Sequence, residues 1–187
     1  MKLKLLISLL VCYNGFAQTI LTNSLDKETG NKTIITNNHT STELTTDDSI
    51  VRDGLIFFSA GYQKINTSGT EIYFVEVNIV HKDNRLGCLK IGESKIILYL
   101  EDGTSIECSQ ISETDCDPIG FTSAFALMPR KGTMEMMMQN FDKLMKTKIK
   151  SIKVITTESS PIFTVKSAAK LYIMNHFVLL DKTIKAS

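Results

Sequence analysis

The sequence predicts an α+β fold, in which two amphipathic helices pack on one antiparallel β-sheet, open or sandwich-like, of about seven to nine strands. Strict alternation of apolar residues with Glu76 and Asn78 marks a half-buried strand over 71–81. The dipeptide Asp102-Gly103 between two β-branched runs marks a hairpin. After Thr133 the apolar period changes from 2 to about 3.6, which is typical of a helix.

The first seventeen residues have the layout of a cleaved secretory signal. A positive start is followed by an apolar run and by small residues at the −3 and −1 positions: Lys2, Lys4, 5–11, Gly15 and Ala17. The apolar run is far shorter than the roughly 20 residues that a membrane span needs. We therefore expect 1–17 to be a signal peptide and 18–187 to be a single domain. This domain would be exported to the periplasm, the cell surface or the medium, with no transmembrane span.

Runs of β-branched, aromatic or alternating apolar residues predict the strands. In chain order they are 19–23, 32–36, 54–65, 71–81, 95–100, 104–109, 121–128, 149–157 and 162–165. Polar turns separate the members of each hairpin, and the Thr-rich segment 37–48 is expected to be a loop. Asp102-Gly103 predicts a type I′ turn, because both residues tolerate the left-handed backbone that this turn needs.

Two segments have helical periodicity. Thr133 is a good N-cap for a helix whose core side falls within one 120° arc at 100° per residue. The residues expected on that side are Met134, Met137, Met138, Phe141, Leu144 and Met145. Apolar residues also cover half a helical wheel over 167–182, although their β-branched and aromatic content leaves a strand as the alternative.

Three cysteines remain after removal of the signal, and export would place them in an oxidising compartment. Cys108 and Cys116 flank a short polar loop, so we predict that they form a disulfide and that Cys88 is unbonded. A bridge between Cys88 and Cys108 remains the alternative.

The residues offer little support for catalysis, so an enzyme is the less favoured class. Neither a Gly-x-Ser-x-Gly elbow nor a zinc motif of the His-Glu-x-x-His or Cys-x-x-Cys type is present. A base–thiol pair of His81 and Cys88 is less plausible than a strand-end histidine beside a packed cysteine. Glu113, Asp115 and Asp117 alternate as calcium ligands do, but Pro118 stands where a calcium loop needs Gly. We predict no catalytic residue, no cofactor and no metal site.

The methionine cluster of 128–138 is the least ordinary feature. Thioethers can hold Cu(I), but the helical wheel directs most of these side chains to the core, where Met is a flexible filler. Met136 points outward and lies close to Lys143 on the wheel. These two residues form the candidate contact strip.

Charge is distributed unevenly, although the chain as a whole is close to neutral, with a formal net charge of +1. Segment 18–129 is acidic and segment 130–153 is basic. The basic segment is most simply a solvated helix face followed by a Lys-rich strand. We expect no nucleic-acid partner, because the sequence has no interleaving of aromatic and basic residues.

Four short motifs carry a resemblance: Gly-Phe-Ala-Gln at 15–18, the turn and strand of 26–36, the run 95–103, and the helix–strand unit of 134–154. In these the chain resembles small exported proteins of Bacteroidota. The resemblance implies an α+β domain with an antiparallel sheet and implies no activity.

The leading functional hypothesis is an exported, non-catalytic binding or surface module, with another protein as a candidate partner. A periplasmic inhibitor or immunity protein that blocks a toxin or enzyme is the second hypothesis. An unrecognised enzyme is the third.

Overall fold

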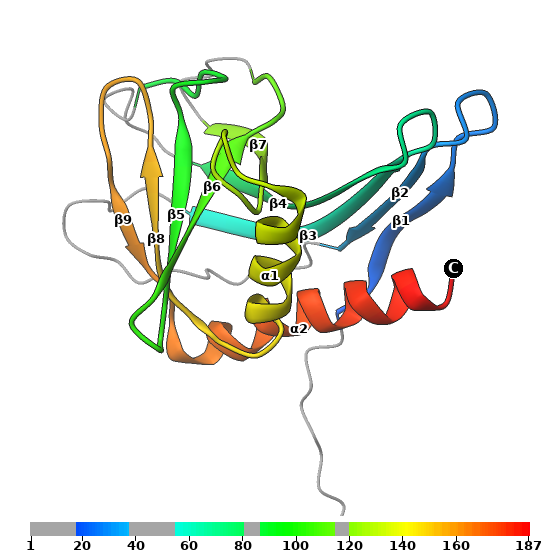
Figure 1. Cartoon of the computed structure of the whole chain (residues 1–187). Helices are drawn as coiled ribbons and strands as arrows, with labels where there is room; N and C mark the ends of the chain where they lie inside the picture. Colours follow the sequence, from blue (N-terminus) through cyan, green and yellow to red (C-terminus); the bar gives the residue numbers. More distant parts are fainter. Residues whose placement is uncertain (1–17, 38–54, 81–86, 115–119) are drawn as a thin grey trace, which may run out of the picture.

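The computed structural model describes residues 18–37, 55–80, 87–114 and 120–187, which form nine strands and two helices (Figure 1). The strands are β1 (Ile20–Leu25), β2 (Lys32–Thr36), β3 (Leu55–Ile65), β4 (Thr70–Val80), β5 (Lys95–Leu100), β6 (Ser105–Gln110), β7 (Gly120–Ala126), β8 (Ile149–Ile155) and β9 (Ile162–Thr164). The helices are α1 (Met134–Leu144) and α2 (Ser167–Lys185). The predicted α+β class is confirmed. The signal segment and the loop 37–48, apart from Asn37, lie outside the described residues.

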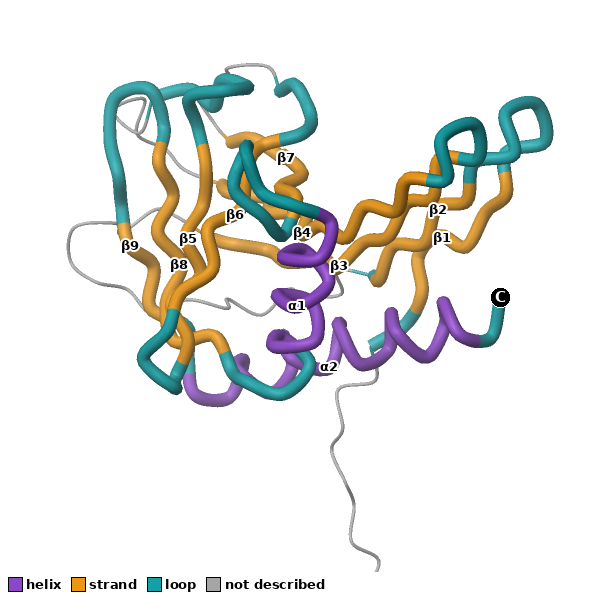
Figure 2. The backbone as a smooth tube through the Cα atoms, in the orientation of Figure 1, coloured by secondary structure: helices purple, strands orange, loops and turns teal. Residues whose placement is uncertain are grey.

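All nine strands belong to one antiparallel sheet in the order β1-β2-β3-β4-β7-β6-β5-β8-β9. The sheet curls into a half-barrel, in which β5, β6, β8 and β9 stand at a steep angle to β3 and β4 (Figures 1 and 2). The change of direction falls at β6 and β7, which pair at Ser109↔Ala126 and Gln110↔Phe125. This short seam divides the sheet into a β1–β4, β7 half and a β5, β6, β8, β9 half.

The longest pairing joins β3 to β4 and runs from Leu55↔Val80 to Ile65↔Thr70. Its centre contains a close contact, because the ring of Phe74 lies on Gly61 of the opposite strand. A Cβ at residue 61 would lie 2.2 Å from Phe74 Cζ, so only glycine fits there. The ring covers backbone that glycine leaves open, and this protects the cross-strand hydrogen bonds at that point.

The turn between β5 and β6 differs from the prediction. Gly103 has a φ of +84°, but no non-glycine residue in the described part of the chain has a positive φ. Asp102 therefore cannot take the left-handed conformation that a type I′ turn needs. Gly103 N donates to Leu100 O (3.2 Å) and Leu100 N to Thr104 O (2.9 Å), as in a type I turn followed by a glycine bulge. The Asp102 carboxylate stabilises this turn by accepting from Thr104 N at 2.9 Å.

Helix α1 begins as predicted, because Thr133 Oγ1 accepts a hydrogen bond from Met136 N at 3.2 Å. Its buried residues are Met137, Phe141 and Leu144, which span only about 60° of the wheel. The prediction that Met134 and Met138 lie on the core side is wrong, because Met134 is 37% exposed and Met138 is 51% exposed. The physical reason is the curvature of the sheet. Helix α1 contacts β4 and α2, and the sheet bends away from the rest of the helix.

The last element is a helix, which excludes the strand alternative. Its buried residues are Ala169, Tyr172, Ile173, His176, Phe177 and Leu180. Helix α2 crosses the concave side of the sheet and contacts β2 and β3 of one half and β8 of the other. Both helices therefore share one hydrophobic core with the inner faces of the strands.

We expect Phe141→Ala to lower the free energy of unfolding by about 3–5 kcal/mol, the usual range for a buried Phe. The Phe141 ring lies 4.5 Å from that of Tyr73 and 6.1 Å from that of Phe177, so truncation opens a cavity between α1, α2 and the sheet. Met136→Ala, at a side chain that is 41% exposed, is the control and should change stability little. Urea denaturation measures both, and equal losses would contradict the orientation of α1.

Candidate binding cleft

A cleft of about 400 Å³ lies between the projecting end of strands β1–β4 and the C-terminal end of α2. Its sheet side is built from two cross-strand rows. The outer row is Leu25, Lys32, Lys64 and Glu71, one residue from each of β1, β2, β3 and β4 in register. The next row inward contributes Ile34 and Tyr62, which are also in register. Ile184 and Ser187 complete the lining from the helix side.

This arrangement follows from the period of the strands. Residues two apart on a strand share a face, so Lys32 and Ile34 both point to the concave side, as do Lys64 and Tyr62. Further along the same face the side chains become buried and, apart from Thr36, apolar. The concave surface therefore changes from charged at the hairpin tips, through aromatic, to the apolar core.

Tyr62, at the inner end of the cleft, is the first of a series of packed aromatic rings. Tyr62 lies 5.2 Å from Tyr73, Tyr73 lies 4.5 Å from Phe141, and Phe177 lies 5.8 Å from Phe58, all measured between ring centroids. These contacts join β3, β4, α1 and α2 into one rigid unit. The cleft thus has a preformed apolar wall.

Three charged side chains form the rim. Lys64 Nζ lies 3.5 Å from Glu71 Oε1. Lys32 is opposite Lys64 in the β2–β3 register, and in the described part of the chain it has no acidic partner. Two like charges opposite each other repel, and one carboxylate does not neutralise both. The rim therefore attracts a negatively charged group.

The hydroxyls of Tyr62, which lines the cleft, and of Tyr73, whose ring packs against it, stay protonated at neutral pH. Burial, with Glu71 beside it as charge and hydrogen-bond acceptor, raises the pKa of Tyr62 well above its usual range. Burial also raises the pKa of Tyr73, with Glu71, Asp181 and Asp142 adding to the effect. A tyrosine with a raised pKa is a hydrogen-bond donor and a poor base or nucleophile. The Tyr62 hydroxyl can therefore donate a hydrogen bond at the inner end of the cleft.

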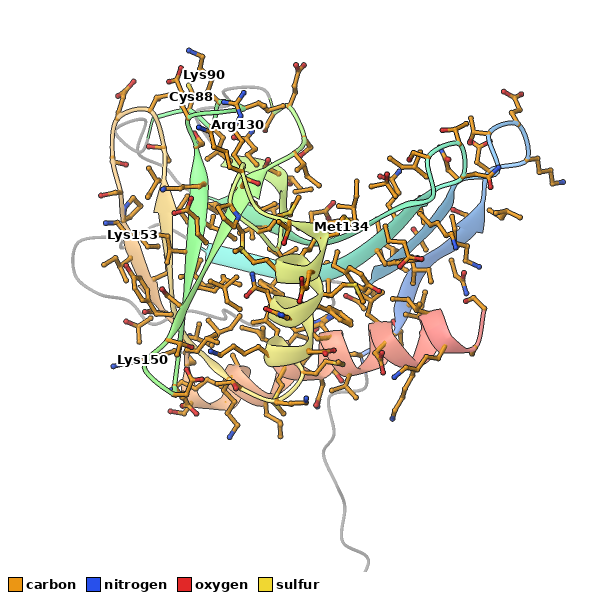
Figure 3. All side chains as sticks on the ribbon, in the orientation of Figure 1. Cys88, Lys90, Arg130, Met134, Lys150 and Lys153 are labelled. Carbon is orange, nitrogen blue, oxygen red and sulfur yellow. The ribbon has the colours of Figure 1, made fainter. Side chains whose placement is uncertain are left out.

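The two residues of the predicted contact strip differ: Met136 is exposed and Lys143 is half-buried. Met136 is outward, as expected. Lys143 Nζ forms an ion pair with Asp102 Oδ2 at 3.4 Å, which ties α1 to the β5–β6 turn. Met134, which was predicted to face the core, is exposed on the side of α1 toward the projecting strands (Figure 3).

His176 of α2 is fully buried, and the sequence indicates only that it lies in a helix. His176 Nδ1 lies 2.7 Å from Thr36 Oγ1. Thr36 Oγ1 also accepts from Ala60 N (2.8 Å) and donates to Ala60 O (3.1 Å), so its side chain extends the β2–β3 ladder. This network fastens α2 to the sheet and is structural.

The predicted Cys108–Cys116 disulfide is wrong. Cys108 is a free, fully buried thiol on the inner face of β6, and burial beside Glu107 raises its pKa. Cys116 lies outside the described residues. Cys88, which we predicted to be unbonded, is disulfide-bonded. The alternating period of β6 explains the error, because Cys108 shares its face with the core residue Ile106 and is buried with it.

Several residues that the sequence analysis considered for metal binding or catalysis lie outside the described part of the chain. Within 18–37, 55–80, 87–114 and 120–187, no group of three His, Cys, Asp or Glu residues is placed to hold a metal ion. His81, Asp115 and Asp117 lie outside these ranges. Among the same residues no helix is long and apolar enough to cross a membrane.

Comparison of the chain with protein-family models, curated proteins and solved structures gives no match.

We expect Cys108 to resist alkylation by iodoacetamide in the native protein and to react only after unfolding, because its thiol is buried. Peptide mapping under non-reducing conditions should find Cys88 in a bridge, with Cys116 the expected partner once the signal segment is removed. A mapped bridge that contains Cys108 would contradict this expectation, and rapid labelling of Cys108 in the folded protein would contradict its burial.

Proposed function

We propose that the protein is an exported, non-catalytic binding module and that the cleft at the end of β1–β4 is its ligand site. The observation that carries the proposal is the pairing of a preformed apolar wall with a cationic rim in one cavity. Cavities of about 300–1,000 Å³ with apolar walls and a few placed polar groups are typical of ligand sites. The ligand would lay its apolar part against Leu25 and Ile184, with Tyr62 at the inner end of the cleft.

The polar part of the ligand would lie at the rim. The Lys32–Lys64 pair favours an anionic group, since Glu71 is already engaged by Lys64 and Tyr62. The Leu25 side chain is 63% exposed at the mouth of the cleft and would be covered by the bound ligand. Burial of such a side chain adds about 1.5–3 kcal/mol at most to binding.

The contact strip of Met136 and Lys143 is part of the same proposal as a second, protein-facing surface. Under this proposal both helices are amphipathic. The apolar side of α1 faces the core, and Met136 lies on its outer side. Methionine is common at adaptable binding surfaces because its side chain is flexible and polarisable. The cleft is the stronger of the two candidates, because Lys143 is held by Asp102.

A matched pair of variants tests the cleft. The probe is 1-anilinonaphthalene-8-sulfonate, which combines an apolar body with an anionic group. We expect Leu25→Asp to weaken its binding several-fold, because the substitution places a carboxylate at the mouth. Leu21 lies on the same strand, is 62% exposed and does not line the cleft, so Leu21→Asp should bind as the unaltered protein does. Fluorescence titration measures the affinity. Equal effects of the two substitutions, or no saturable binding, would overturn the assignment.

Export is proposed from the layout of residues 1–17. Intact-mass analysis of protein recovered from the native host should give a mature chain that begins at Gln18. A chain that retains Met1, or one that begins at Cys12 with an attached lipid, would contradict the proposed processing.

A further inference from the structure

A second cavity, of about 330 Å³, lies at the seam between the two halves of the sheet. Its floor is a cross-strand row of Lys95, Ser109 and Ala126, which belong to β5, β6 and β7. One wall is the turn of residues 91–94 before β5, and the other is the segment that follows β7, with Met128 and Arg130. The cavity is distinct from the cleft, because the two share no lining residue.

Arg130 closes one side of this cavity by reaching across to the opposite wall. Its Nη1 donates to Gly92 O at 3.4 Å. Gly92 has a φ of +89°, and a Cβ at this position would lie 2.6 Å from Arg130 Nη1. Residue 92 must therefore be glycine for two reasons: its backbone has a positive φ, and a Cβ would collide with the Arg130 guanidinium. Arg130 and Lys90 lie at the same end of the molecule (Figure 3).

The guanidinium has spare hydrogen-bonding capacity. A guanidinium offers five N–H donors, and the contact to Gly92 uses one. The neighbouring charges are already paired, since Lys95 Nζ lies 2.7 Å from Glu107 Oε2 and Lys90 pairs with Glu93. Among the residues that the structure describes, Arg130 has no carboxylate partner. One positive charge, on the exposed Arg130 side chain, thus remains unneutralised at the cavity.

Apolar side chains also line the cavity. Ile91 is 44% exposed and Ile111 is 42% exposed, and both line the cavity together with Ala126 and Met128. The site therefore has a charged part, the Arg130 guanidinium, and an apolar part, the exposed isoleucines. The carboxylates of Glu93 and Glu107 stand at the rim and disfavour a ligand with two or more negative charges.

We propose that this cavity binds a monocarboxylate attached to a compact apolar group, with the carboxylate on Arg130 and the apolar group against Ile91, Ile111 and Met128. The planar guanidinium matches a carboxylate through two parallel hydrogen bonds, which gives both affinity and orientation. Either a free apolar acid or the C-terminal residue of a peptide has this chemistry.

The test uses isothermal titration of the purified protein with N-acetylphenylalanine and with its amide as the uncharged control. The acid should bind saturably and the amide should not. Arg130→Gln should weaken binding of the acid by about tenfold or more, because a charge-assisted bond is lost. Arg130→Lys, which keeps the charge without the planar fork, should also weaken it. Lys131→Gln removes an adjacent exposed charge that does not line the cavity and should bind as the unaltered protein does.

Equal binding of acid and amide, or no binding of either, would overturn the proposal. So would unaltered affinity in the folded Arg130→Gln variant, or an equal loss in Lys131→Gln, which would indicate unspecific attraction. Titration with 3-phenylpropanoate and with acetyl-Ala-Ala-Phe distinguishes the two sources of the carboxylate: comparable affinities favour a free acid, and clearly tighter binding of the peptide favours a peptide terminus. Leu25→Asp should leave all these affinities unchanged, so this result is independent of the proposed cleft function.

Discussion

The packing of α2 across the concave side of the sheet is the interaction on which the other features depend. The sheet is weakest at its seam, where β6 and β7 pair over two residues. Helix α2 contacts β2 and β3 on one side of that seam and β8 on the other, so its burial holds both halves at their steep angle. The position of the helix is specified by apolar contacts of Phe177 and by the bond between His176 and Thr36, whose side chain also completes the β2–β3 ladder.

Both candidate ligand sites are consequences of this geometry. The strands β1–β4 extend past the end of α2, so their last concave row is left without a covering helix and becomes the cleft. The second cavity lies beside the short β6–β7 pairing, where the sheet changes direction. In each case a curved sheet leaves apolar surface accessible beside unneutralised positive charge. Such a pairing suits amphiphilic anions better than uniformly polar ligands.

The errors of sequence interpretation have specific physical causes. The wheel of α1 places Met134 and Met138 toward a flat partner surface, but the actual sheet curves away and buries only a narrow stripe. The separation of Cys108 and Cys116 along the chain suggests a bridge, but the two-residue period of β6 turns Cys108 into the core. Asp102-Gly103 suits a two-residue turn, whereas the Asp102 carboxylate stabilises a longer one by binding Thr104.

Local patterns determined the approximate bounds of the strands and the N-cap at Thr133, and they favoured a helix for the C-terminal segment without excluding a strand, because these features depend on neighbours within one or two turns of chain. The tertiary structure alone decided which charges meet across strands. Lys32 is far in sequence from the hairpin pair of Lys64 and Glu71, and it joins them in one rim only through the β2–β3 register. Gly92 and Arg130 belong to different turns, and their contact depends on how the sheet bends. Pairing register and curvature are set by the packing of the whole core, which no local pattern specifies.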